Sequence, residues 1–150
     1  MKPLCALALS TSLMLAPLAA TAQDGPMMKD ASGSVAETVT ALSAAIEGAG
    51  ATVFAVIDHG GGARKVGEDI GDMQLVVFGN PALGTPAILD DPMAGLHLPL
   101  KVLVYEDAEG TTHMTWESPE AMLAGLNIPA DAAYLGKMAG ALENLTNAAR

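Results

Sequence analysis

Cysteine and aromatic residues are scarce in this chain of 150 residues. The one cysteine, Cys5, lies in an apolar N-terminal stretch that has the features of a leader. The rest of the chain therefore has no thiol with which to form a disulfide, a thiolate zinc site or a cysteine nucleophile. Only two phenylalanines, two tyrosines and one tryptophan are present. We expect a core that is mainly aliphatic and that holds the fold without covalent cross-links.

Basic residues are also few. Seven Lys and Arg residues face seventeen Asp and Glu residues, which gives a net charge of −10 with histidine neutral. A surface this acidic repels the phosphates of nucleic acids and anionic lipid headgroups. We therefore expect no nucleic-acid partner, and no membrane partner once the leader has been removed.

The first 22 residues have the pattern of a secretory signal peptide. Lys2 gives a positive start, residues 4–18 are mostly apolar, and the small residues at 20–22 suit signal peptidase. A membrane anchor is the alternative, but the apolar stretch is short and hydroxyl residues interrupt it. We predict that residues 1–22 are cleaved and that the protein is exported, to the periplasm or outside the cell.

The remainder is long enough for one domain with its own core. Residues 23–33 lack periodicity and are predicted to be a flexible lead with a short edge strand near its end. Residues 34–150 are predicted to form a single domain. The long Pro- and Gly-rich connection over 79–99 is expected to be mostly loop, with one helical piece over 86–91.

Predicted helices and strands alternate along this domain. Ser34 and Glu37 have the spacing of a capping box at the start of a helix over 34–48. Further helices are expected over 63–70, after Ser118, and after Asp131. The helix after Asp131 is predicted to bury one apolar face, made of Leu135, Met138, Leu142 and Leu145. Strands are expected over 52–57, 75–78, 100–105 and 111–116, and the last two are joined by a hairpin turn with Gly110 at positive φ.

This order of elements predicts an α/β (α+β) two-layer sandwich. We expect a small mixed β-sheet with helices packed mainly on one face. The strand over 52–57 is apolar on both faces, which favours a central position in the sheet.

The stretch LVVFGNPALGTP over 75–86 is the most distinctive part of the sequence. An apolar strand stops abruptly there, and Asn80, Gly84 and Thr85 follow its end. Asp58 and His59 follow the end of the strand before it. If the two strands run parallel, all five residues meet at one rim of the sheet, where ligands commonly bind in open α/β sheets. We therefore predict a small-molecule site at this rim.

Two roles are open for these residues. As an acid/base pair, Asp58 and His59 would serve a hydrolase- or isomerase-like enzyme, with Asn80 and the backbone amides near Gly84 holding an oxyanion. As structural residues, Asp58, Asn80 and Thr85 would cap the helices and turns that follow them. We rank ligand binding above catalysis.

Other motifs are weaker. The stretch GGGARK over 60–65 suggests a phosphate loop, but the carboxylates of Glu68 and Asp69 stand where a lysine and a hydroxyl residue are needed. A third, weaker candidate function is copper or haem handling through histidine and methionine side chains. His113 and Met114 point to opposite faces of a strand, and Gly95 disfavours a helix that would join Met93 to His97. We predict no metal and no cofactor.

Several motifs recur in the same order in one known family. The most specific is FGNP at 78–81 followed by GTP at 84–86, and DH at 58–59 after an apolar strand supports it. Through these motifs, residues 34–150 resemble family number 302 of the domains of unknown function. The resemblance implies a small two-layer α/β sandwich and a homodimer, and it assigns no activity.

Overall fold

The computed structural model of the protein describes residues 25–150. The predicted signal at 1–22 therefore lies outside the described residues. The strands are β1 (Met27–Ala31), β2 (Thr52–Asp58), β3 (Met73–Gly79), β4 (Leu100–Glu106) and β5 (Thr112–Trp116). The helices are α1 (Val35–Gly48), α2 (His59–Lys65), α3 (Pro81–Asp90), α4 (Ala94–His97), α5 (Pro119–Met122) and α6 (Ala133–Ala148).

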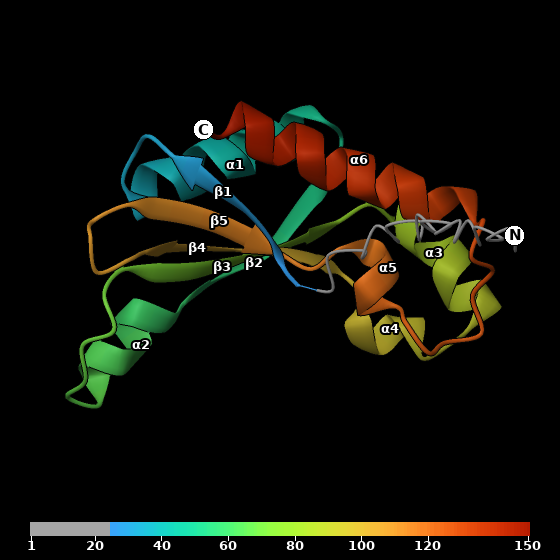
Figure 1. Ribbon diagram of the computed structural model, residues 1–150, viewed down its shortest axis with the longest axis horizontal. Coiled ribbons are helices and arrows are strands. Elements are labelled where there is room, and N and C mark those ends of the chain that lie inside the picture. The colour runs from blue at the N-terminus through green and yellow to red at the C-terminus, as the bar shows by residue number, and fades with distance from the viewer. Residues whose placement is uncertain (1–24) are drawn as a thin grey trace, which may run out of the picture.

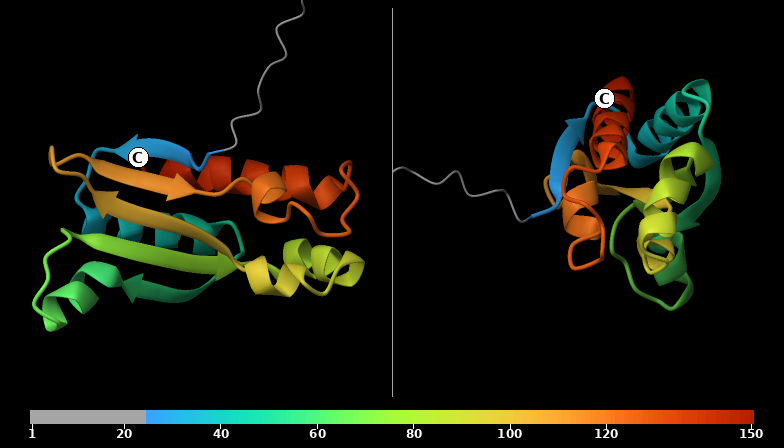
Figure 2. Two further views of the ribbon diagram at one scale, coloured as in Figure 1. Left: turned by 60° about the horizontal axis from the view of Figure 1, so that its bottom comes forward. Right: turned by 90° about the vertical axis from the view of Figure 1, so that its right-hand side faces the viewer.

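The strands form one sheet in the order β1-β5-β4-β3-β2, with the long helices α1 and α6 together on one face (Figure 1). The predicted two-layer α/β sandwich with helices mainly on one face is confirmed. The prediction of a mixed sheet is wrong in one respect, because every neighbouring pair of strands is antiparallel. Figure 2 shows α2 beyond one end of the sheet and α3 and α4 beyond the other.

The core lies between the sheet and the two long helices. The capping box at Ser34 is present, since its side chain accepts from the Glu37 amide while the Glu37 carboxylate accepts from the Ser34 amide. The predicted apolar face of α6 is buried at Leu135, Met138, Leu142 and Leu145. Among residues 25–150, no helix combines the length and the apolar character needed to cross a bilayer.

The strand expected near the end of the lead is present as β1, and it pairs with β5 along its whole length. Lys29 holds it to α6, because its Nζ donates to Glu143 Oε1 and to Asn147 Oδ1, both at 2.6 Å. The Lys29 ammonium also lies 5.6 Å from the ring centroid of Trp116. Residues 27–31 are thus part of the sheet, and the domain starts before residue 34.

Strand β2 lies at the edge of the sheet, so its predicted central position is wrong. Several of its apolar side chains are only partly covered: Phe54 is 57% exposed, and Val56 and Ile57 are each 44% exposed. An apolar composition on both faces indicates burial in most sheets. Here it produces an exposed apolar edge instead.

The connection over 79–99 is mostly helical, which corrects the predicted loop. Helix α3 begins at Pro81, directly after its cap Asn80, and continues through Pro86. Proline is favoured at the first helical position, and both Pro81 and Pro86 gave that signal in the sequence. The helix begins at Pro81 and not at Pro86 because Asn80 caps it: Asn80 Oδ1 accepts from the Ala82 amide at 2.9 Å.

Helix α2 begins four residues before its predicted start, directly after its cap Asp58. Gly60 allows this position, since a Cβ there would lie 2.5 Å from the carbonyl oxygen of Gly71. The backbone of α2 therefore packs closely against the segment that leads into β3. The chain returns at the same end of the sheet, and β2 and β3 form an antiparallel pair.

Candidate functional site

The five residues of the predicted rim do not meet. Because β2 and β3 are antiparallel, Asp58 is opposite Gln74 at the start of β3, whereas Thr52 is opposite Gly79 at its end. Asp58 and His59 lie at one end of the sheet, and Asn80, Gly84 and Thr85 lie beyond the other. A seven-residue strand separates the two groups by about 20 Å. The assumption of parallel strands was the error.

Asp58 and His59 have structural surroundings. Asp58 Oδ1 accepts from the Gly61 amide at 2.7 Å, so the carboxylate caps α2. His59 is exposed on the first turn of the same helix. Neither residue lines the cavity described next. The prediction of an Asp58–His59 acid/base pair depended on a shared rim, and the structure does not contain that rim.

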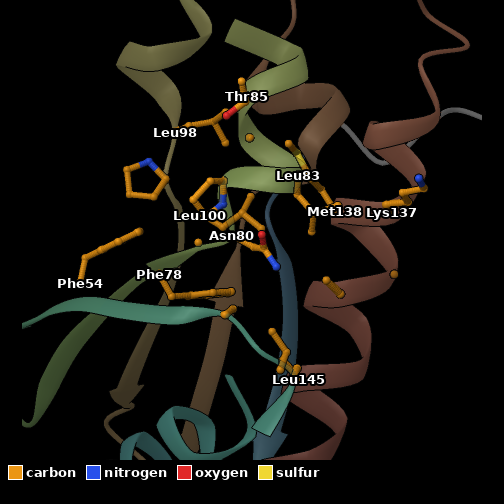
Figure 3. A pocket seen from close by; sticks show the side chains of 18 of the residues that line it. Phe54, Phe78, Asn80, Leu83, Thr85, Leu98, Leu100, Lys137, Met138 and Leu145 are labelled. Carbon is orange, nitrogen blue, oxygen red and sulfur yellow. The ribbon is translucent and has the colours of Figure 1, made fainter. Parts of the chain in front are cut away.

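A cavity of about 790 Å³ lies at the other end of the sheet. It is bounded by the ends of β2 and β3, by α3 and α4, and by one face of α6 (Figure 3). Its wall is largely apolar, with Phe54, Phe78, Leu83, Leu98, Met138 and Leu145 among its members. Three of the predicted site residues, Asn80, Gly84 and Thr85, also line it.

The polar groups of the wall are few. Asn80 is already engaged, because its Oδ1 caps α3 and its Nδ2 lies 3.5 Å from the Gly50 carbonyl oxygen. The sequence suggested that Thr85 could cap a helix starting at Pro86. Instead, Thr85 lies within α3. Lys137 lines the cavity with its stem, while its ammonium points away from the other labelled side chains (Figure 3).

Phe54 is one of the apolar wall residues that the sequence did not indicate. Val53 is opposite Phe78 and Ala55 is opposite Val77, so Phe54 is the extra residue of a β-bulge. A bulge redirects the side chain that it carries. The Phe54 ring covers Gly79, where a Cβ would lie 3.1 Å from the ring and 3.4 Å from Pro99. Glycine at 79 therefore leaves room for an aromatic wall.

Two polar contacts hold the end of α3 to the later part of the chain. The Tyr134 hydroxyl, at the start of α6, donates to Asp90 Oδ2 at 2.7 Å. Burial, together with the Asp90 carboxylate, raises the pKa of Tyr134 to about 12, so the phenol keeps its proton. Asp91 Oδ2 accepts from the Asn127 amide at 3.0 Å. These contacts join the end of α3 to the start of α6 and to the segment that precedes it.

A second polar cluster lies on the sheet face opposite the long helices. His113 Nδ1 lies 2.9 Å from Asp30 Oδ1, and His113 Nε2 lies 2.7 Å from Asp107 Oδ2. A neutral imidazole carries a single N–H, so two carboxylate partners favour the doubly protonated ring. Both carboxylates raise the pKa of His113, and Asp107 has the larger effect. In turn, the hydrogen bond with His113 lowers the pKa of Asp107. The cluster joins β1, β5 and the β4–β5 turn.

The structure also locates the histidines and methionines that suggested metal handling. His113 and Met114 do face opposite sides, since Met114 is fully buried. Helix α4 forms despite Gly95, with Met93 as its N-cap and His97 as its last residue. Within residues 25–150, no three His, Cys, Asp or Glu side chains are arranged to hold a metal ion.

A sequence model of the family described as "Domain of unknown function DUF302" matches residues 27–149. The chain belongs to the DUF302 family. A crystal structure of an uncharacterized conserved DUF302 protein from Bacillus stearothermophilus superposes with a TM-score of 0.76 at 21% identity. That match covers 83% of this chain and 98% of the other. The likeness shows that the two proteins share the fold.

Curated relatives come from Brucella. A protein of Brucella suis named fluoride-specific ion channel FluC 1 is 32% identical over 126 residues, which are 83% of this chain and 50% of the relative. A Brucella abortus protein of the same name is also 32% identical, and 47% of its length is covered. This DUF302 chain thus spans about half the length of the curated relatives that it matches.

Proposed function

We propose that this DUF302 domain binds a small, largely apolar molecule in the cavity between β3, α3, α4 and α6. The observation that supports the proposal is the cavity itself, about 790 Å³ in volume with a mainly apolar wall. Natural ligand sites commonly measure about 300–1,000 Å³ and combine apolar walls with a few polar groups. In this proposal Asn80, Gly84 and Thr85 keep the binding role predicted for them, and Asp58 and His59 do not.

Helix α6 supports the proposal through its small side chains. Lys137, Ala141 and Asn144 line the cavity and, at spacings of four and three residues, share one face of the helix. Ala141 stands at the centre of that face, and Gly140 beside it also lines the cavity. A Cβ at Gly140 would contact nothing within 4 Å. Small residues here keep open a space that larger side chains would fill.

The names of the Brucella relatives suggest fluoride as a second ligand. Fluoride transport is a property of those proteins, which are about twice as long as the matched segment. The cavity suits an apolar molecule better, because a small hydrated anion loses its water only where donors or cations replace it. We therefore propose an apolar ligand for this chain.

An uncharged apolar dye tests the proposed function. We expect the naphthalene dye prodan to bind at one molecule per chain. Its emission should shift to the blue, because its ring system moves from water into an apolar cavity. Fluorescence titration gives the dissociation constant, and native mass spectrometry gives the stoichiometry. The measurement with 10 mM sodium fluoride serves as a control and should not change the titration. Absence of saturable binding by prodan and other uncharged apolar probes would contradict the proposal.

Export of the protein is a further proposal, based on the residues at 1–22. We expect the chain isolated from its own host to start at Gln23 and to contain 128 residues, since 150 − 22 = 128. Intact-mass spectrometry of the periplasmic and culture fractions checks both the cleavage and the location. A full-length chain confined to the cytoplasmic fraction would overturn it.

A further inference from the structure

The cavity concentrates the phenylalanines of an aromatic-poor chain. The protein has two phenylalanines, and both line the cavity. Phe78 is buried at 2% exposure beneath it, whereas Phe54 is 57% exposed at its edge. Pro81 and Pro99 add two compact apolar rings to the wall. The two phenylalanine rings therefore give the cavity the flat faces in its wall.

Phe54 is placed to contact an occupant. The bulge between Val53 and Ala55 redirects it, and its ring edge covers Gly79. More than half of its surface remains uncovered by protein. Figure 3 shows Phe54 and Phe78 projecting from neighbouring strands along the same side of the cavity. An aromatic ring with an uncovered face is a surface on which another ring can stack.

The charges around the cavity favour an uncharged occupant. Of the described residues 25–150, Lys137 is the one charged residue that lines the wall, and its ammonium is directed away from the cavity in Figure 3. A charged group transferred from water into an apolar site without a partner is strongly disfavoured. The net charge of −10 also disfavours the approach of anions.

From these three observations we infer that the cavity takes a flat, uncharged ring compound that stacks on Phe54. The inference rests on the proposed function and names its ligand class. Phe54 contacts the ligand and determines specificity, and the aliphatic wall formed by Leu83, Leu98 and Met138 supplies the remaining contact. A purely aliphatic molecule gains nothing from the ring of Phe54.

The test compares a flat probe with an aliphatic probe in two variants of the full mature chain. The flat probe is prodan, and the aliphatic probe is n-decanol, measured by calorimetry. Phe54→Leu keeps an apolar side chain but removes the ring, and Phe54→Tyr keeps the ring. We expect Phe54→Leu to weaken prodan roughly two- to twelvefold, the worth of one aromatic contact, and to change decanol less than twofold. Phe54→Tyr should bind prodan as the parent does.

The anionic dye 1-anilinonaphthalene-8-sulfonate tests the charge requirement, because it has a similar ring system with a sulfonate. We expect it to bind at least tenfold more weakly than prodan. Equal losses of prodan and decanol in Phe54→Leu, or binding of the sulfonate as tight as that of prodan, would overturn the inference and leave the proposed function standing. If neither prodan nor decanol binds the parent protein, both the inference and the proposed function fail. Thermal unfolding of each variant verifies that it is folded.

Discussion

Substitution of Ala141 by phenylalanine should weaken the binding of prodan more than tenfold and should also stabilise the protein. Ala141 lies at the centre of the α6 face that lines the cavity, between Lys137 and Asn144. A phenylalanine there occupies the space that the ligand needs. Filling an apolar cavity typically adds about 0.5–2 kcal/mol of stability. We expect about 1 kcal/mol, which in a domain of this size raises Tm by about 3–5 °C.

Opposite changes in binding and stability distinguish a ligand site from a packing defect. An unfavourable substitution of a residue that only supports the fold lowers both ligand affinity and stability. Enlargement of a residue that keeps space for a ligand lowers ligand affinity but makes the empty protein more stable. Prodan titration and thermal unfolding in the absence of dye measure the two quantities separately. If Ala141→Phe binds prodan like the parent, the dye does not occupy this cavity.

Ala148→Leu provides the matched control. Ala148 is the last residue of the same helix, it is exposed, and it does not line the cavity. An enlarged apolar side chain there should leave prodan binding unchanged and Tm within about 1 °C, since exposed substitutions usually change stability by less than about 0.5 kcal/mol. A similar loss of binding in both variants would point to a general effect on α6.

Local signals in the sequence predicted the elements whose stability is local. Ser34 and Glu37 satisfy each other's backbone amides, so the start of α1 needs no information from the rest of the chain. Gly110 takes φ of +83° in the β4–β5 turn, as its position in the hairpin indicated. The apolar spacing of α6 predicted its buried face. These features depend on residues within one or two turns of each other.

The site could not be predicted in the same way, because it depends on strand direction. The polar residues after β2 and β3 meet only if the strands are parallel, and the sequence between them permits either direction. Gly60 permits a close approach to Gly71, where the chain returns toward β3, and such a contact between backbones leaves no periodic signal. The bulge that redirects Phe54 is equally silent, since an alternation broken by one residue within an apolar strand is invisible in sequence.

Two different uses of polar groups follow from the same antiparallel sheet. At the cavity, Asn80 serves as the cap of α3, and the wall around it is largely apolar. On the other face, the Asp30–His113–Asp107 cluster brings three titratable groups from β1, β5 and the β4–β5 turn into contact. The tyrosine ring of Tyr105 on β4 lies 5.3 Å from the His113 ring. We therefore expect the attachment of β1 to depend on pH.

The protein should become less stable as pH rises from about 6.5 into the alkaline range. Asp107 and Asp30 raise the pKa of His113 above its ordinary 6.5, so the folded state holds the proton more tightly than the unfolded state. The contribution of His113 is complete below pH 6.5 and is lost as pH rises through the raised pKa. One such group changes the unfolding equilibrium constant by at most about tenfold per pH unit.

Asp107 gives the opposite dependence at low pH. Its pKa lies below its ordinary 3.8, chiefly because of His113, so its contribution is complete above pH 3.8 and is lost as pH falls through the lowered value. The cluster is therefore most favourable between about pH 4 and 6.5. Urea unfolding from pH 3 to 9, followed by the fluorescence of Trp116 opposite Met27 of β1, measures the profile.

His113→Gln isolates the cluster from all other titrations. Glutamine keeps hydrogen-bonding atoms but cannot take up a proton, so the variant should be less stable than the parent at pH 6 and should lose the alkaline decline. His59→Gln, which removes an exposed histidine on α2, should keep the parental profile. Hydrogen exchange adds a local readout: after correction for the intrinsic exchange rate, which itself rises with pH, the protection of the β1 amides should fall in the parent above the raised pKa of His113 and should be reduced at all pH values in His113→Gln. An alkaline decline of equal steepness in His113→Gln would assign the pH dependence to other groups.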